Sequence, residues 1–304
     1  MPLTRRELIG SIALTGVGAL VPALGVARPK PLTKPIPSSG EALPMVGLGS
    51  WITFNVGNDP VARDSSAQVM RAFFDAGGRM IDSSPMYGSA QDVIGYCLKK
   101  TGNTANVFAT DKVWIADGKD GPKQIAQSRE RWGVDRFDLL QVHNLVAWEA
   151  HLNTLHAMKD EGKLLYVGIT TSHGRRHEEL ERIMREHELD FVQLTYNVAD
   201  REVEDRLLPL AHEKGIAVIA NRPFRRKALI QRFEGKKLPA WADEIGATSW
   251  AQFLLKFIIS HPAVTCAIPA TTRVDHVREN LDSAREPLPD AKMRRRMVAY
   301  IHEV

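Results

Sequence analysis

An aspartate and a tyrosine lie five positions apart in a segment whose pattern predicts that both face a ligand. Met80 and Ile81 form a short apolar run typical of a buried strand, Asp82 ends it, and Tyr87 lies on the polar loop beyond. Residues at the carboxyl ends of parallel strands line the mouth of a β/α barrel, so this placement would direct a carboxylate and a phenol into one site. Taken alone, the segment also fits a buried structural aspartate beside a turn tyrosine.

Two further apolar segments end in residues that can do chemistry. Residues 107–114 place Lys112 at a strand end, and residues 137–144 place His143 at the next. Singly, such a lysine is usually solvated and such a histidine is usually a satisfied core residue. Three consecutive strands that deliver Asp, Lys and His to one rim indicate an active site.

These side chains suit the reduction of a carbonyl by hydride transfer, because the developing alkoxide needs a proton. A phenol has a pKa of ~10 and is a poor donor near neutrality. An ammonium from Lys112 would favour the anion of Tyr87, and Asp82 would keep Lys112 charged and in place. His143 would hydrogen-bond the substrate oxygen and help to hold its charge. The hydride must come from a nicotinamide, since no side chain carries one; no metal or covalent nucleophile is required.

The elements that must position these residues alternate along the chain. A chain of 304 residues, 44% of them apolar, can bury a large core, and the alternation of short strands with helices favours one domain. Helices are expected at 63–76, 90–100, 122–132, 147–161, 175–186, 202–214, 249–260 and 274–284, with a last basic helix at 290–302 across the outside or bottom. Eight strands paired with eight helices predict an α/β fold, a (β/α)8 TIM barrel over residues 44–304.

With Asp82, Tyr87, Lys112 and His143 in this order, the sequence resembles the bacterial aldo-keto reductases, whose catalytic tetrad is Asp, Tyr, Lys and His. The resemblance runs over roughly residues 44–283. Segments 47–51, 162–169, 191–197, 215–220 and 267–273 resemble the first, fifth, sixth, seventh and eighth strands of that family. The resemblance implies an oxidoreductase that uses NADPH to reduce a small aldehyde or ketone to an alcohol, with Tyr87 as the general acid.

The sequence contains no Gly-x-Gly-x-x-Gly motif, so a Rossmann domain does not bind the cofactor. The resemblance implies instead that NADP lies extended across the barrel mouth. Gln193 would hold the carboxamide, and the loop after the seventh strand would cover the pyrophosphate. Arg273, beside two threonines at a helix start, would hold the 2′-phosphate and so favour NADP over NAD. The cofactor-binding residues expected in this way are Thr170, Thr171, Gln193, Asn221, Arg222, Arg225, Arg226, Thr271, Thr272, Arg273, Glu279 and Asn280.

Three departures from the family pattern concern this cofactor site. Thr170-Thr171 stand where Ser-Asn is common, Asn221 stands where an aromatic ring often stacks, and residues 225–227 are Arg-Arg-Lys where glycines are common. The basic run would either clamp two phosphates or block their approach, and its charge favours the clamp. These departures keep open an alternative function, a non-catalytic nucleotide-binding or redox-sensor protein on the same barrel. A metal-dependent barrel hydrolase is a remote third possibility, because the sequence lacks the clusters of His and Asp at strand ends that such an enzyme needs.

The substrate pocket is expected to be apolar and open. Trp51, Phe54, Met86 and Trp114 lie on the first strand-end loops and would wall it, with core packing as the alternative for each.

The first residues have the features of an export signal. Arg5 and Arg6 form a twin arginine, residues 9–26 are apolar and uncharged, and residues 25–27 are small. We therefore expect a signal peptide at residues 1–27, a linker at 28–43, a periplasmic protein and the twin-arginine (Tat) export machinery as a partner. An uncleaved membrane anchor is the rival, which Pro22 weakens, so stable membrane insertion is not expected.

Composition gives little evidence for other partners. The formal charge of +4 comes from 40 basic and 36 acidic residues without a nucleic-acid-binding motif, so no nucleic acid is expected. Cys97 and Cys266 are predicted to be buried small hydrophobes, and His173 and His177 to be surface residues without a metal. A monomer is expected.

Overall fold

The computed structural model describes residues 30–304, and the predicted signal peptide lies outside them. The centre is a sheet of eight strands, each parallel to its neighbours along the chain. A parallel bridge between Val46 and Ala267 joins its two edges. The strands are β3 (Leu48–Gly49), β4 (Met80–Asp82), β5 (Phe108–Val113), β6 (Phe137–His143), β7 (Leu164–Thr170), β8 (Phe191–Thr195), β9 (Ala217–Asn221) and β10 (Cys266–Ala267).

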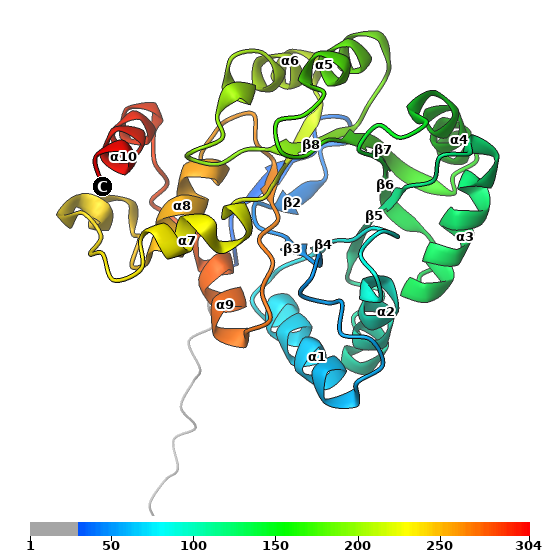
Figure 1. Cartoon of the computed structure of the whole chain (residues 1–304), viewed down its shortest axis with the longest axis horizontal. Coiled ribbons are helices and arrows are strands. Elements are labelled where there is room, and N and C mark those ends of the chain that lie inside the picture. The colour runs from blue at the N-terminus through cyan, green and yellow to red at the C-terminus, as the bar shows by residue number, and fades with distance from the viewer. Residues whose placement is uncertain (1–29) are drawn as a thin grey trace, which may run out of the picture.

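Helices surround this sheet in the predicted alternation, which confirms the (β/α)8 barrel (Figure 1). They are α1 (Pro60–Asp75), α2 (Ala90–Thr101), α3 (Gly121–Trp132), α4 (Trp148–Asp160), α5 (His177–Glu186), α6 (Leu207–Lys214), α8 (Trp250–Ile259) and α9 (Val274–Asp282). Side-chain caps define several starts: Asp59 accepts the Ala62 amide before α1, and Ser249 accepts the Gln252 amide before α8. The helix predicted from residue 175 begins at His177, so Arg175 lies on the preceding loop.

Two apolar layers hold the barrel together. Met80, Phe108 and Phe191 are fully buried inside it, near the amino-terminal ends of their strands. A larger layer lies between strands and helices and includes Phe73, Trp132 and Phe253. The strands are therefore buried on both faces, as parallel strands usually are, and this packing fixes where their carboxyl ends lie.

Residues 30–43 pack against the domain, in a region where the sequence analysis predicted a linker at residues 28–43. Strands β1 (Thr33–Pro35) and β2 (Ala42–Pro44) form an antiparallel hairpin. Ile36 and Leu43 are fully buried in the inner layer, and the Lys34 ammonium donates to the carbonyls of Ile259, His261 and Val264 at 2.9, 2.7 and 2.6 Å. The hairpin therefore closes the end of the barrel where the strands begin. The hairpin packs there because burial of the apolar side chains of Ile36 and Leu43 is favourable.

An insertion between β9 and α8 was not predicted. It contains the short helices η3 (Arg225–Lys227), α7 (Ala228–Arg232) and η4 (Ala240–Ile245). The last helix, α10 (Ala291–Glu303), packs outside the barrel beside this insertion, as Figure 1 shows. Its Met297 and Ile301 are buried, and its Arg296 lies 4.3 Å from the ring centre of Trp241 in η4. In residues 30–304, no helix combines the length and apolar character needed to cross a membrane.

Candidate active site

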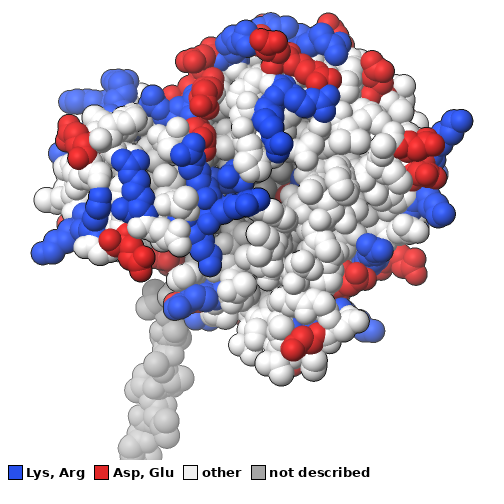
Figure 2. Space-filling view, viewed as in Figure 1, with Lys and Arg blue, Asp and Glu red and all other residues white. Residues whose placement is uncertain are grey.

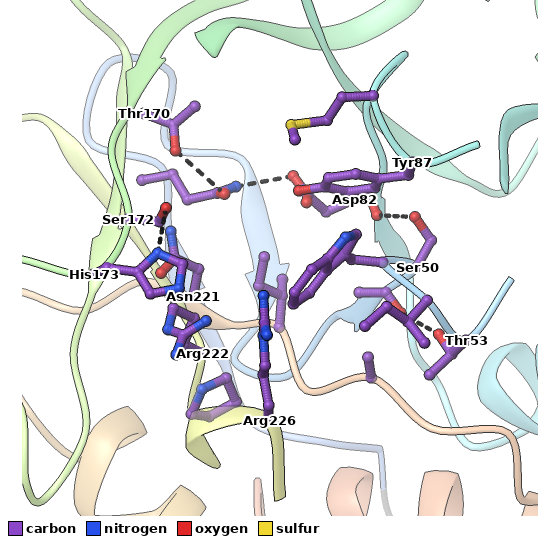
Figure 3. A pocket seen from close by; sticks show the side chains of 18 of the residues that line it. Ser50, Thr53, Asp82, Tyr87, Thr170, Ser172, His173, Asn221, Arg222 and Arg226 are labelled. Carbon is purple, nitrogen blue, oxygen red and sulfur yellow. Dashed lines mark hydrogen bonds between the residues drawn. The ribbon is translucent and has the colours of Figure 1, made fainter. Parts of the chain in front are cut away.

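A cavity of about 400 Å³ opens at the carboxyl ends of the strands (Figure 3). Asp82, Tyr87, His143 and Gln193 contribute polar groups to its lining. Apolar side chains of Trp51, Ile52, Met86 and Ile268 form other parts of its wall. A mostly apolar hollow with a few convergent polar groups is the usual form of a small-molecule site.

An ion pair lies at the base of the predicted tetrad. The Lys112 ammonium is 2.6 Å from Asp82 Oδ2, with side-chain exposures of 0% and 3%, and it also donates to the Ser83 carbonyl at 2.8 Å. Its nitrogen is 5.4 Å from the ring centre of Tyr87. In the register of β4 and β5, Asp82 is opposite Thr110, so Lys112 extends two residues beyond the end of β4 toward Tyr87. The geometry therefore joins three of the four predicted catalytic residues.

The phenol of Tyr87 is protonated at neutral pH. Burial raises its pKa to about 12, although the Lys112 ammonium acts in the opposite direction. Burial also disfavours the ammonium of Lys112, but Asp82 and Tyr87 raise the pKa of that lysine above its ordinary value. A neutral acid therefore lies beside a fixed positive charge, which is the arrangement that proton donation to a developing alkoxide needs.

His143 completes the tetrad as a neutral imidazole. Burial, and then the charge of Lys112, lower its pKa to about 2. Its Nδ1 lies 2.7 Å from the hydroxyl of Ser84, which accepts the Met86 amide at 3.3 Å. Because that amide supplies one proton to the hydroxyl oxygen, Ser84 can donate its own proton to Nδ1, and the imidazole proton then resides on Nε2. The ring meets Tyr87 edge-on, with 5.8 Å between the ring centres, so the imidazole and the phenol are neighbours in the lining of the cavity.

The sequence analysis did not single out Ser84 or Gln141, and it assigned Gln193 to the cofactor carboxamide rather than to Asp82. Gln193 Nε2 and Gln141 Nε2 donate to Asp82 Oδ1 at 2.8 and 3.4 Å. Gln193 also accepts from Thr170 at 3.4 Å, so its amide holds Asp82 instead of standing free for a carboxamide. Gln141 could have been found from its position on β6, because it lies two residues before His143 and therefore on the same side of the strand.

A second buried carboxylate fixes the backbone at Lys112. Asp111 accepts bonds from Gln91 Nε2 at 2.7 Å and from Trp132 Nε1 at 2.6 Å, and from the Lys112 amide at 2.7 Å. These bonds tie β5 to α2 and α3. Lys112 is therefore held by its backbone as well as by its ammonium.

Polar groups replace the stacking ring at the end of β9. Asn221 accepts from Thr195 Oγ1 at 2.7 Å and donates to the Thr171 carbonyl at 2.9 Å. The Thr171 hydroxyl is buried and has no hydrogen-bond partner in the described structure. A nicotinamide here would meet amide and hydroxyl groups rather than an aromatic face.

The loop after β9 brings positive charge to the cavity. Arg222, Arg226 and Lys227 line it, and Arg222 Nη1 is buried without a partner among the described residues. Arg226 lies 4.2 Å from the ring centre of Trp51, so a contact spans the mouth between the loops after β9 and β3. Arg225 points elsewhere and pairs with Asp200, with Nε 2.8 Å from Oδ2. Arg225 is therefore not among the cavity-lining residues. The positive charges of Arg222, Arg226 and Lys227 fit a dinucleotide, whose phosphates are negative.

Comparison with known proteins identifies the family. The model of the aldo/keto reductase family matches residues 45–298. The chain belongs to the aldo/keto reductase family.

Relatives and solved structures of the family agree with this assignment. The methylglyoxal reductase YeaE of Escherichia coli is 29% identical over 270 residues, which cover 86% of this chain and 92% of that protein. An NADH-specific methylglyoxal reductase of Escherichia coli is 25% identical over 231 residues, or 64% of this chain and 68% of that protein. An aldo/keto reductase of Klebsiella pneumoniae in complex with NADP and acetate superposes with a TM-score of 0.72 at 23% identity, over 86% and 92% of the two chains. A thermostable aldo-keto reductase with the inhibitor epalrestat gives 0.74 at 25% identity, over 88% and 99%.

The aldo/keto reductase resemblance predicted an adenosine site at the start of α9, and the structure places those residues outside the cavity lining. Arg273 is exposed and pairs with Asp275, with Nε–Oδ1 and Nη2–Oδ2 distances of 3.0 and 2.5 Å. Its charge is therefore already shared with a carboxylate. Of the other residues predicted there, Thr271 and Asn280 are buried, Thr272 is exposed and Glu279 is half-buried.

Two of the four predicted pocket residues belong to the cavity of this aldo/keto reductase. Trp51 and Met86 line it. Phe54 is instead 1% exposed within the outer apolar layer, because the loop after β3 turns back and its amide bonds the Ser50 carbonyl. Trp114 is 40% exposed and lies outside the lining. Phe54 therefore follows the core-packing alternative, whereas Trp114 belongs neither to the core nor to the lining of this cavity.

The remaining expectations concern cysteines and metals. Cys97 and Cys266 are buried free thiols, as predicted. His173 lines the cavity, whereas His177 does not. Within the described part of the chain, no group of three or more His, Cys, Asp or Glu residues is placed to hold a metal ion.

Proposed function

We propose that this protein reduces an aldehyde or ketone to an alcohol with NADPH, and that Tyr87 is the general acid. The observation that carries the proposal is the meeting of a protonated phenol, a buried ammonium and a neutral imidazole at one cavity. A bound nicotinamide supplies the hydride.

The side chains then act on the carbonyl oxygen. That oxygen lies between the Tyr87 hydroxyl and His143 Nε2–H, which together fix the angle of the carbonyl. Tyr87 donates its proton as negative charge develops, and the ammonium of Lys112 stabilises the resulting phenolate. Asp82 keeps Lys112 charged and positioned, and the neutral His143 remains a donor throughout.

The choice of NADPH rests on positive charge. Arg222 and Arg226 line the cavity where the resemblance places the pyrophosphate, and Arg273 lies where it places the 2′-phosphate. The Klebsiella structure is an NADP complex, while one Escherichia coli relative is named NADH-specific. Because Asp275 shares the charge of Arg273, we expect a moderate preference for NADPH rather than an absolute one.

Tyr87→Phe tests the catalytic assignment. Purified protein is mixed with NADPH and a panel of aldehydes and ketones, and nicotinamide absorbance is followed. Loss of the general acid should lower kcat by about 10²–10⁴-fold, while NADPH binding, measured by fluorescence titration, stays nearly unchanged. Tyr96→Phe is the matched control, since the Tyr96 hydroxyl bonds Asp64 away from the cavity. Full activity of Tyr87→Phe would contradict the proposal.

A non-catalytic nucleotide-binding or sensor protein is the second candidate. It is favoured by the engagement of Gln193 with Asp82 and by Asn221 in place of a stacking ring. This alternative predicts tight NADPH binding by the wild type without oxidation by any carbonyl in the panel.

We also propose that the protein is exported by the twin-arginine route with its cofactor bound, because that route is associated with folded proteins. The support is the pair Arg5 and Arg6 before an apolar run. The test compares the cellular location and cofactor content of the wild type with those of the Arg5→Lys, Arg6→Lys variant. A wholly cytoplasmic wild type would refute the signal, and empty periplasmic protein beside loaded cytoplasmic variant would refute co-export.

A further inference from the structure

The basic residues that line the cavity differ from their neighbours in their ion pairing. On the loop between β7 and α5, Arg176 pairs with Glu179, whereas Arg175 lines the cavity and has no ion pair in residues 30–304. The loop after β9 repeats this difference, since Arg225 pairs with Asp200 while Arg226 faces the cavity unpaired within the same described range. The cavity therefore keeps positive charge that the protein does not neutralise.

This charge lies on two sides of the cavity. The cations on the loop after β9 are those expected to meet the phosphates of a dinucleotide. Arg175 comes from the loop after β7, where the resemblance places no phosphate. Figure 2 shows lysine and arginine side chains gathered around the hollowed centre of the face that bears the cavity. Asp82 is the acidic residue of the cavity lining, and Lys112 already pairs with it.

A second hollow of about 230 Å³ adjoins the cavity on the β7 side. The two share Asn144, Ser172 and Arg175, so Arg175 stands at their junction. The hollow is also lined by Thr171, which is 2% exposed, and by Arg176, which pairs with Glu179. Among the described residues, Arg175 is therefore the cation of this hollow that has no ion pair.

The guanidinium of Arg175 is held only loosely by the protein. Its Nε reaches the Ser172 carbonyl at 3.4 Å, and its Nη2 lies 3.4 Å from His173 Nδ1. Both contacts are at the long limit of a hydrogen bond, so the planar fork of donors remains available for a carboxylate or phosphate.

We propose that Arg175, at the junction of the two hollows, forms a subsite for an anionic oxygen group of the carbonyl substrate. This inference rests on the proposed function. Asn144 directly follows His143 and lines both hollows, so a substrate whose carbonyl meets His143 would extend along Asn144 to Arg175. The preferred substrates are then aldehydes or ketones that carry a carboxylate or phosphate, rather than neutral ones.

The test uses substrates with the same reacting group and different charge: p-carboxybenzaldehyde and its neutral methyl ester. Arg175→Ala should raise KM for the acid by roughly 10- to 100-fold, the range for a lost charge-assisted hydrogen bond. The KM values for the ester and for NADPH should change little. Arg185→Ala is the matched control, because that arginine on α5 pairs with Glu181 and lines neither hollow, and Arg175→Lys should recover part of the loss. p-Formylphenyl phosphate shows whether the subsite takes phosphate better than carboxylate.

Equal effects of Arg175→Ala on acid and ester would overturn the subsite, and so would a change in the KM for NADPH of similar size. Calorimetric binding of p-(hydroxymethyl)benzoate to NADP-loaded protein separates this inference from the proposed function. Binding that Arg175→Ala abolishes, without reduction of any aldehyde, would support the subsite and refute the reductase. Reduction of the ester without any binding of the carboxylate would do the reverse.

Discussion

The two partners of the buried ion pair are expected to contribute unequally to stability. Asp82→Asn leaves the Lys112 ammonium fully buried without a counter-charge, with neutral acceptors such as the Ser83 carbonyl at 2.8 Å. Removing one partner of a buried pair typically costs about 3–5 kcal/mol. Lys112→Met instead leaves Asp82 with donors from Gln193 and Gln141 at 2.8 and 3.4 Å, so its cost should be nearer the roughly 1–3 kcal/mol of an impaired buried polar group. We therefore expect Asp82→Asn to be the more destabilising by about 2 kcal/mol.

Urea unfolding followed by tryptophan fluorescence measures this difference, with activity measured in parallel. Both variants should lose most of their carbonyl-reducing activity. Lys112→Met removes the positive charge beside Tyr87, and Asp82→Asn removes the carboxylate that keeps Lys112 charged and in position. In the variant with both substitutions, the loss of stability should be smaller than the sum of the two, since the residues are in contact. Equal losses, or a larger loss in Lys112→Met, would refute the inference that the two glutamines sustain the Asp82 carboxylate.

Three further predictions concern the same cavity. Ser84→Ala should lower kcat more than it raises KM, because it frees the tautomer of His143, and an unchanged kcat would show that Ser84 does not set it. The kcat/KM for reduction should show no ionisation of Tyr87 or His143 from about pH 5 to about pH 9, since a pKa raised to about 12 keeps Tyr87 protonated and one lowered to about 2 keeps His143 neutral; burial raises the pKa of Asp111 to about 7, so a fall near neutrality that persists in Asp111→Asn would contradict this. Asp275→Asn should increase the preference for NADPH over NADH, and Arg273→Ala should decrease it, as titrations with both cofactors would show. If neither substitution changes the preference, the 2′-phosphate does not bind at the start of α9.

The barrel and the meeting of the four proposed catalytic residues at one cavity could be predicted because their signals are local. Asp82 and His143 are the last residues of their strands and Lys112 lies one residue before the end of its strand, and the carboxyl ends of parallel strands must meet at one rim. The segments that escaped prediction depend on distant contacts. Ile36 is one apolar residue in a polar stretch, and only the inner layer of the barrel shows what buries it.

Side-chain partners were harder to predict than positions. Nothing local indicates that Gln193 bonds Asp82, because the two lie 111 residues apart in the chain. Phe54 and Trp51 sit on the same loop, yet one packs into the core and the other faces the cavity. That outcome depends on the backbone conformation of the loop, which the sequence pattern does not predict. The pairing of Arg225 but not Arg226 likewise depends on where Asp200 lies.

The hairpin at the amino-terminal end of the strands gives this reductase a defined orientation for attachment. Residue 30 precedes β1, and Lys34 fixes that strand to the carbonyls around His261, at the end of the barrel where the strands begin. The cavity opens at the opposite end. A bead, an electrode or a fused carrier joined ahead of residue 30 would thus hold the molecule with its mouth facing the solution, and substrate diffusion would be unobstructed. Attachment through the insertion after β9 would instead place the carrier beside Arg226 and narrow the approach.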